Sequence, residues 1–196
     1  MSFRIEKKIY IKKEQLIEFK SFLFQKNIRE IYKPREVESI YFDNCFNQIY
    51  FDSIEGLCPR KKIRIRNYPG KKNKEYFLEY KISSVEGRYK KKKEIALDVF
   101  NHHLKFGIFD TKYGVCKPNL IVKYNREYLK KEDVRITIDT DINYKLYNNN
   151  IQKKDSDTII ELKTTINKNL DDLLKDYPLQ EIRFSKYCNG MGLFKS

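Results

Sequence analysis

Charged side chains recur at every second position along several segments of the chain. Their types suit the binding of phosphates, because the planar fork of an arginine matches pairs of phosphate oxygens and a carboxylate can hold a divalent cation. Phosphoryl transfer requires mainly positioning and charge stabilisation from a protein. The pattern therefore points to a site for a phosphorylated polyanion. Its charged members are Arg4, Glu6 and Lys8; Lys62, Arg64 and Arg66; Glu79 and Lys81; Arg126; Arg135 and Asp139; and Glu161 and Lys163.

A period of two residues is typical of β-strands, so strands must position these side chains. Apolar residues occupy the alternate positions, as Ile63 and Ile65 do between the cations of residues 62–66. Helical spacing of apolar residues is less common, and Ser185 is placed to cap a short helix that runs towards Phe194. Strands are predicted over 3–11, 38–43, 62–68, 76–82, 120–128, 134–142 and 158–166, and helices over 13–26, 94–109 and 168–177.

The fold class follows from what the charged faces would cost. A sheet with one face in water also alternates, and that interpretation explains any single strand. It explains the whole set less well, because lysines and arginines that gather on one surface repel one another unless an anion lies between them. We therefore expect an α+β, mainly β, chain that forms one domain over residues 1–196. Its antiparallel sheet would close into a β-barrel, with a hydrated ionic tunnel inside and a few covering helices outside.

The overall charge agrees with an anionic partner. Lysine and arginine number 41 against 27 acidic residues, which gives a formal net charge of +14. The four cysteines are scattered, with no C-x-x-C motif, so we expect neither a disulfide nor a zinc site. The chain begins without an apolar run of the signal-peptide type and has no stretch that could span a bilayer. These features predict a cytoplasmic protein.

Seven short motifs, in order along nearly the whole chain, resemble the polyphosphate polymerase (VTC) domain of the triphosphate tunnel metalloenzymes. No single motif is specific, but the order of all seven is difficult to obtain by chance. The motifs are S-I-Y-F-D-N at 39–44, R-K-K-I-R-I-R-N-Y at 60–68, F-L-E-Y-K at 77–81, K-Y-N-R-E-Y at 123–128, R-I-T-I-D at 135–139, I-I-E-L-K at 159–163 and R-F-S-K-Y-C-N-G at 183–190.

The resemblance implies a polymerase that transfers the terminal phosphoryl group of ATP to a growing chain of inorganic polyphosphate, with Mn²⁺ or Mg²⁺. By motif position, Glu161 would hold the metal; Glu6 or Glu79 could assist it through water. The basic phosphate ligands would be Lys8, Arg64, Arg66, Lys81, Arg126 and Lys186. Further substrate contacts would come from Arg4, Lys91, Tyr124, Arg135, Lys163 and Ser185, and Lys91 is chosen from the run of lysines at 90–93.

Three alternatives stay open. Hydrolases of the same superfamily begin with an E-x-E-x-K strand, whereas this chain has Arg4 at the first acidic position, which favours the holding of a polyanion. A non-catalytic module for polyphosphate or nucleic acid is the second alternative. Most tyrosines here lie in apolar strands instead of between exposed lysines, so we expect no nucleic-acid partner. Third, Glu161 and Lys163 could be ion-paired neighbours on a solvated strand, and Asp139 could simply pair with Arg135.

Overall fold

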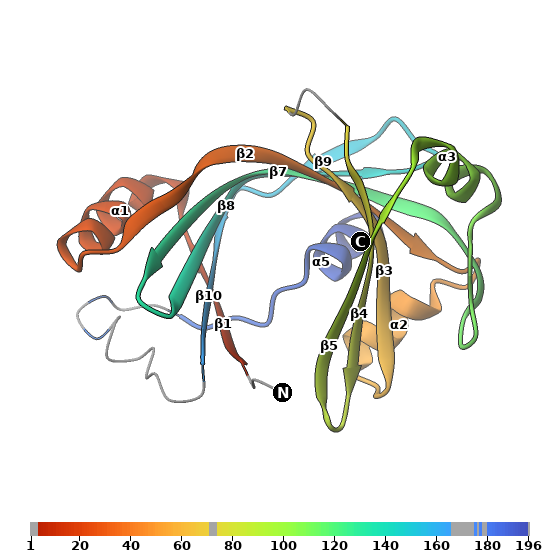
Figure 1. Cartoon of the computed structure of the whole chain (residues 1–196), viewed down its shortest axis with the longest axis horizontal. Coiled ribbons are helices and arrows are strands. Elements are labelled where there is room, and N and C mark those ends of the chain that lie inside the picture. Colours follow the sequence, from red (N-terminus) through yellow and green to blue (C-terminus); the bar gives the residue numbers. More distant parts are fainter. Residues whose placement is uncertain (1–3, 71–73, 166–174, 176, 178–179, 196) are drawn as a thin grey trace. The chain divides into compact units, whose positions relative to one another are not determined.

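A computed structural model describes residues 4–70, 74–165, 175, 177 and 180–195. Figure 1 labels its helices and strands along the chain. The strands are β1 (Arg4–Ile11), β2 (Arg29–Asp43), β3 (Arg60–Asn67), β4 (Tyr76–Ser84), β5 (Gly87–Ile95), β6 (Ile108–Asp110), β7 (Gly114–Lys131), β8 (Val134–Leu146), β9 (Gln152–Lys154) and β10 (Thr158–Thr165). The helices are η1 (Lys13–Gln15), α1 (Leu16–Gln25), α2 (Gln48–Glu55), α3 (Leu97–Phe106) and α5 (Lys186–Lys195).

The strands form one sheet in the order β1-β10-β8-β7-β2-β3-β4-β5, with β6 added to β7 and β9 added to β8. The pairs β1–β10, β10–β8, β2–β3, β3–β4, β4–β5 and β6–β7 are all antiparallel. Within the described residues, the two end strands β1 and β5 do not pair with each other. The mainly β class is confirmed, but the closed barrel predicted from the alternating pattern is wrong. Alternation determines which side chains share a face, whereas closure also depends on strand tilt and on the pairing of two edges.

The chain divides into two compact units. The first contains residues Met1–Glu36, Tyr124–Ile142 and Lys154–Phe184, and the second contains Val37–Lys123, Asn143–Lys153 and Ser185–Ser196. The long strands β2, β7 and β8 each contribute residues to both units.

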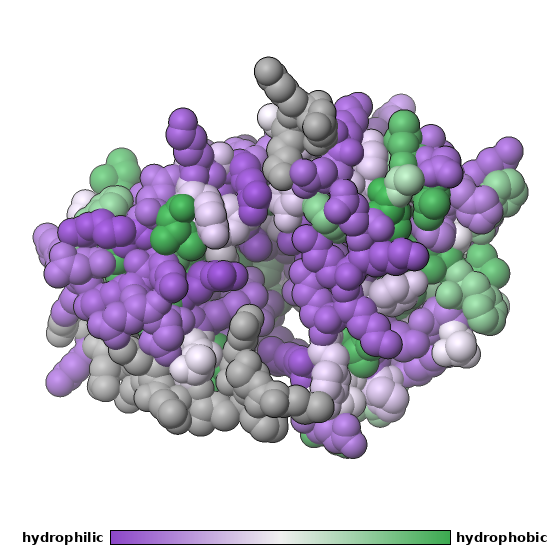
Figure 2. Space-filling model, viewed as in Figure 1, coloured by the Kyte–Doolittle hydropathy of each residue, from purple (hydrophilic) through white to green (hydrophobic). Residues whose placement is uncertain are grey.

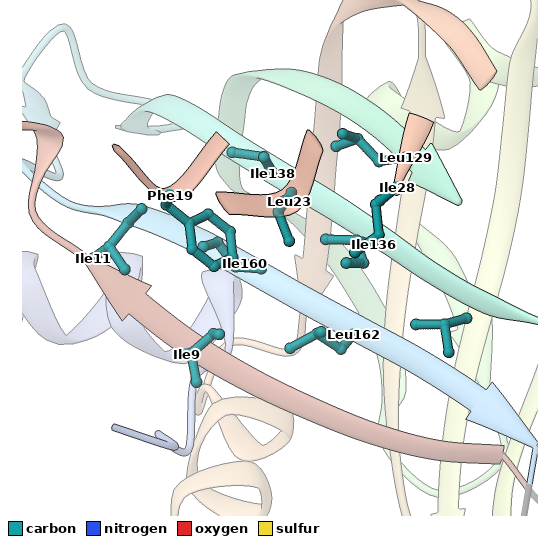
Figure 3. Close-up of a cluster of buried hydrophobic side chains, with 11 residues drawn as sticks. Ile9, Ile11, Phe19, Leu23, Ile28, Leu129, Ile136, Ile138, Ile160 and Leu162 are labelled. Carbon is teal, nitrogen blue, oxygen red and sulfur yellow. The ribbon is translucent and has the colours of Figure 1, made fainter. Parts of the chain in front are cut away.

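In the first unit, α1 covers one face of the sheet. Phe19 and Leu23 of this helix are fully buried against isoleucine, leucine and valine side chains from β1, β7, β8 and β10. Figure 3 shows these side chains gathered between the helix and the strands. Because side chains alternate along a strand, the burial of one set under α1 leaves the charged set on the opposite face.

In the second unit, different helices lie on the two faces of β3–β5. Phe100 of α3 stacks on Tyr76 of β4, with ring centroids 4.0 Å apart, on the apolar face that also carries Leu78. Tyr187 of α5 stacks on Tyr41 of β2, 5.1 Å away, on the opposite face. A helix at each face therefore protects the strands while the charged face keeps part of its surface in water.

The helices predicted over 13–26 and 94–109, and the one capped by Ser185, are present as α1, α3 and α5. Helix α2 was not anticipated, and the helix predicted over 168–177 lies almost wholly outside the described residues. No helix within the described part of the chain is long and apolar enough to cross a membrane. Figure 2 shows that hydrophilic side chains cover most of the face in view, as expected where 35% of residues are charged.

Candidate functional site

The second unit presents a strongly basic sheet surface, which we call the cationic face. The pairing register places side chains of β3, β4 and β5 directly opposite one another, so that they project on the same side of the sheet. Eight cations meet only two carboxylates there. The members are Arg60, Lys62, Arg64 and Arg66 of β3, Glu79 and Lys81 of β4, and Arg88, Lys90, Lys92 and Glu94 of β5.

Arg64 lies at the centre of the cationic face and is buried. Its Nε and Nη2 atoms donate to Oε2 of Glu79 at 2.7 and 2.5 Å, and its Nη1 donates to the hydroxyl of Tyr41 at 3.0 Å. Lys90 Nζ reaches the other oxygen of Glu79 at 2.6 Å. Burial alone would raise the pKa of Glu79, but Arg64, Arg66 and Lys90 outweigh it and hold that pKa far below its ordinary value. One carboxylate thus fixes two cations.

The local field is positive beyond these ion pairs. Burial opposes ionisation of the Tyr41 phenol, yet the charges of Arg64, Arg66 and Lys186 lower its pKa below the ordinary value. Arg66 is also buried, and its Nε donates to the Ser39 hydroxyl at 3.2 Å. The lowered pKa of this buried phenol indicates a positive local potential. Such a potential favours the binding of an anion.

Helix α5 begins beside the cationic face. Lys62 Nζ donates to the Ser185 hydroxyl at 2.9 Å, and the same hydroxyl accepts the amide of Cys188 at 3.4 Å, as an N-cap does. Lys186 is the first residue of the helix. The predicted pair Ser185 and Lys186 therefore lies where a hydroxyl, an ammonium and a helix N-terminus can all face an anion.

Asp43, to which no role was assigned from the sequence, anchors this helix. Its carboxylate accepts the backbone N–H groups of Ile49 and Tyr50, both at 2.9 Å, and the hydroxyl of Tyr187 at 2.5 Å. Tyr187 is 1% exposed and stacks on Tyr41. Burial raises the pKa of Asp43, although these hydrogen bonds oppose the shift. Asp43 thus ties the first turns of α2 and α5 to the sheet.

The first unit presents a different surface, which we call the paired face. The registers of β1, β10 and β8 place charged residues on one side of the sheet, and Arg126 of β7 joins them through Asp139. Five cations meet three carboxylates here, a nearer balance than on the cationic face. The members are Arg4, Glu6 and Lys8 of β1, Glu161 and Lys163 of β10, Arg135, Thr137 and Asp139 of β8, and Arg126.

Ion pairs connect most of the paired face. Lys8 Nζ lies 3.2 Å from Glu6 and donates to the carbonyl oxygen of Phe184 at 3.0 Å. Lys163 contacts Glu161 and lies 3.7 Å from Glu6. Cations that are already shared among carboxylates attract an added phosphate less strongly than unshared ones, so the paired face suits a ligand that brings its own positive ion.

Arg126 forms a two-pronged pair with Asp139. Nε and Nη2 donate to the two carboxylate oxygens at 2.6 and 2.7 Å, and Asp139 is fully buried. Burial would lower the pKa of Arg126, but Asp139 outweighs it and raises the pKa well above the ordinary value. The guanidinium lies 5.2 Å above the ring of Tyr124, which adds a cation–π contact. Asp139 therefore pairs with Arg126, not with its same-strand neighbour Arg135.

The acidic residues of the paired face can be tested as ligands for a divalent cation. Glu161 is 8% exposed, and Glu6 is linked to it through Lys163. The buried hydroxyl of Thr137, directly across from Glu161, has no hydrogen-bond partner among the described residues. Mg²⁺ and Mn²⁺ prefer such oxygen donors. Two carboxylates and a hydroxyl fit a cation whose remaining ligands are phosphate oxygens. No three His, Cys, Asp or Glu side chains gather within the same described residues.

The predicted residues divide between the two faces. The cationic face and the start of α5 bring together Arg64, Arg66, Lys81, Ser185 and Lys186, and the paired face contains Arg4, Glu6, Lys8, Tyr124, Arg126, Arg135, Glu161 and Lys163. The choice of Lys91 as a substrate contact from the lysines at 90–93 is corrected by the strand register. It pairs with Tyr80 and projects from the apolar side of the sheet, whereas Lys90 pairs with Lys81 on the cationic face.

Comparisons with known proteins agree on the type of domain. Residues 3–114 and 108–195 match the family model of the VTC domain. A solved structure from Bacillus halodurans, described as a proposed adenylate cyclase, superposes with a TM-score of 0.65 at 16% identity over 100% of this chain and 98% of that chain. The PH1819 protein from Pyrococcus horikoshii gives 0.60 at 20% identity, over 99% and 100% of the two chains. At these identities the structures show a shared fold alone. A search of curated proteins finds no match.

Proposed function

Since the chain belongs to the VTC domain family, we propose that it is a polyphosphate polymerase that uses ATP as phosphoryl donor and a divalent cation as cofactor. The observation that carries the proposal is the cationic face, where eight cations and two carboxylates project from three adjacent strands. An inorganic phosphate chain carries charge along its whole length and offers no apolar group. A surface with many cations and few acids is complementary to that chemistry.

Arg64 and Arg66 are suited to hold phosphate oxygens in fixed positions. Both side chains are buried in the sheet and oriented by Glu79 and Ser39 respectively, so little conformational freedom is lost when an anion binds. Lys62 and Lys186 add more mobile charge beside them. In phosphoryl transfer such groups act by positioning and by stabilising charge on the phosphoryl oxygens.

Glu161 is the residue we propose as the metal ligand, with Glu6 as its support. A divalent cation would supply charge neutralisation at the phosphates of the nucleotide. To bind it, Glu161 must release Lys163, which then becomes available to a phosphate oxygen. The exchange keeps the paired face near electrical balance, because the nucleotide brings negative charge and the cation brings positive charge.

The direct test is incubation with ATP and Mn²⁺, with ADP, free phosphate, pyrophosphate and chain length measured together. A polymerase releases ADP in step with long phosphate chains and with little free phosphate until ATP runs low. One free phosphate for each ADP, without chains, would assign the chain to the hydrolases. Pyrophosphate with a cyclic nucleotide would indicate the cyclase activity suggested for the Bacillus halodurans structure.

A contaminating enzyme could make the same product, so a variant of the proposed site must be compared with a control variant outside it. Arg66→Ala removes a buried cation of the cationic face, whereas Lys91→Ala removes an exposed cation of β5 that projects on the opposite side of the sheet. Chain synthesis should fall strongly in the first variant and remain in the second. Equal chain synthesis by both variants would show that the activity does not depend on the cationic face.

A further inference from the structure

One end of the paired face carries an aromatic and guanidinium cluster that none of the roles above uses. It consists of Tyr32 and Arg35 of β2 and Tyr128 of β7, all in the first unit. The rings of Tyr32 and Tyr128 meet edge to face, with centroids 5.8 Å apart. Arg35 lies 4.7 Å above the Tyr128 ring, and its Nε donates to the Tyr128 hydroxyl at 3.0 Å. We call these three residues the aromatic cluster.

The aromatic cluster is not part of the apolar core. The next residue, Leu129, is buried in the cluster under α1, so alternation directs Tyr128 to the other side of β7. Tyr32 is 59% exposed. A large ring left open to water offers a stacking surface, and the Tyr32 ring is held by its edge-to-face contact with Tyr128.

The aromatic cluster also lies beside a cation of the paired face. Arg126 and Tyr128 are two residues apart on one strand, so they project on the same side and are separated by about 7 Å along it. That spacing is of the same order as the distance from the base of a nucleotide to its inner phosphates. A single ligand could therefore contact both groups within the first unit.

We propose that Tyr32, Arg35 and Tyr128 bind the base of a nucleoside triphosphate whose phosphates extend along the paired face towards Arg126. Tyrosine rings and guanidinium groups stack on the faces of nucleobases, and such stacking requires no particular base. The inference rests on the proposed function, since it assumes that a nucleotide is the phosphoryl donor. It adds that the chain discriminates a nucleotide from inorganic tripolyphosphate, which has the same phosphates and no base.

The test compares two ligands on each variant by calorimetry: a non-hydrolysable ATP analogue and inorganic tripolyphosphate, both with Mg²⁺. Tyr32→Ala should weaken the analogue about tenfold, the size of one lost stacking contact, and leave tripolyphosphate within about twofold. Tyr32→Phe keeps the ring and should bind like the unchanged protein. Arg35→Gln should also weaken the analogue selectively.

Phe24→Ala is the matched control, because Phe24 of α1 is also an exposed ring, 47% accessible, with an arginine, Arg29, 5.8 Å above it. It should change neither affinity. If Tyr32→Ala and Arg35→Gln leave the affinity of the analogue unchanged, or weaken both ligands equally, the base site is wrong while the proposed function stands. Failure of both ligands to bind the unchanged protein would remove the proposed function as well.

Discussion

The two charged faces of this sheet are built from the same residue types but differ in their balance. On the cationic face, Arg64 and Lys90 share one carboxylate, that of Glu79, and most neighbouring positions carry further cations. On the paired face, Arg126 donates to both carboxylate oxygens of Asp139, and Lys8 and Lys163 share Glu6. The same alternating pattern thus produces one surface with a large surplus of charge and one close to neutral.

The difference shows how a chain with a net charge of +14 can bind a polyanion and a metal ion on different surfaces. A surplus of cations attracts and orients a polyanion, but it repels a divalent cation. A balanced set with buried carboxylates can accept a metal ion together with phosphate, because the two added charges offset each other. The proposed ligand roles follow this division: the polyphosphate chain contacts the cationic face, and the nucleotide phosphates and the metal ion, held by Glu161, contact the paired face.

The largest expected effect comes from Arg64→Ala. The substitution leaves buried Glu79 with Lys90 alone, and the loss of one partner from a buried ion pair costs about 3 kcal/mol. We expect the free energy of unfolding to fall by that amount in urea titrations, and tripolyphosphate binding to be lost. Lys8→Ala on the paired face removes a cation that is 25% exposed and should cost less than about 1 kcal/mol. Equal losses in the two variants would contradict the comparison.

Glu161→Gln tests the other side of the comparison. The amide keeps the size of the side chain but is a poor metal ligand, so turnover of ATP should fall roughly a hundredfold while tripolyphosphate affinity changes little. Lys186→Ala should instead weaken binding and turnover together, because it removes positive charge beside Tyr41. If Glu161→Gln keeps most of its turnover, the metal lies elsewhere, and Glu6 becomes the first candidate.

The sequence predicted the faces of β1, β3 and β10 correctly, because a two-residue period is set by strand geometry alone. It failed for Lys91, where the outcome depends on the turn. Strands β4 and β5 are joined through Val85 and Glu86, with Ser84 opposite Gly87, and this register places Lys90 and Lys92, not Lys91, on the cationic face. A shift of one residue moves every side chain of the following strand to the other face.

Two further features of the fold were not predicted from the sequence. Helix α2 is short, and its N-cap residue Asn47 makes no side-chain capping bond. Its first amides are satisfied instead by Asp43, at the end of the preceding strand, and residue patterns for helix starts do not include such a partner. The second feature is the open sheet, although it did leave a signal in the sequence: β5 carries four consecutive lysines, and charged edge strands are disfavoured as pairing partners.

The dependence of folding stability on pH should also reveal the ion pairs of Glu79 on the cationic face. The folded state holds the pKa of Glu79 below the ordinary value of about 4.3, so Glu79 contributes stability above that pH and the contribution is lost as the pH falls further. The stability gap between the unchanged protein and Glu79→Gln should therefore shrink between about pH 5 and pH 3. Glu94→Gln is the control for the loss of a carboxylate, because Glu94 lies on the same face but is exposed. A constant gap for Glu79→Gln would contradict the ion-pair account.

A smaller effect distinguishes adjacent lysines on β5. Lys90→Ala should weaken tripolyphosphate about threefold, because its ammonium is half exposed and screened by solvent. Lys91→Ala should leave the affinity unchanged, since Lys91 projects from the opposite side. Titrations at low and high salt should show a steeper dependence for the unchanged protein than for Lys90→Ala. The reverse ranking of the two lysines would invalidate the register of this hairpin as the basis of the cationic face.

The smallest and most specific effect concerns Arg4 of the paired face. Arg4 lies on β1 with Glu6 and Lys8, and it pairs with Thr165 of β10. Polymerase and hydrolase would share metal and phosphate ligands, and they differ in whether a phosphate-chain oxygen or water attacks the terminal phosphorus. A cation at this position raises the local concentration of the anionic acceptor, whereas a carboxylate lowers it. Arg4→Glu, which restores the acidic pattern of the hydrolases, should raise the share of transferred phosphate that appears free by at least about twofold. Arg4→Lys keeps the charge and should leave the product ratio unchanged. If Arg4→Glu makes chains with the same efficiency, the acceptor is selected by the cationic face without help from β1, and the near balance of the paired face serves the metal alone.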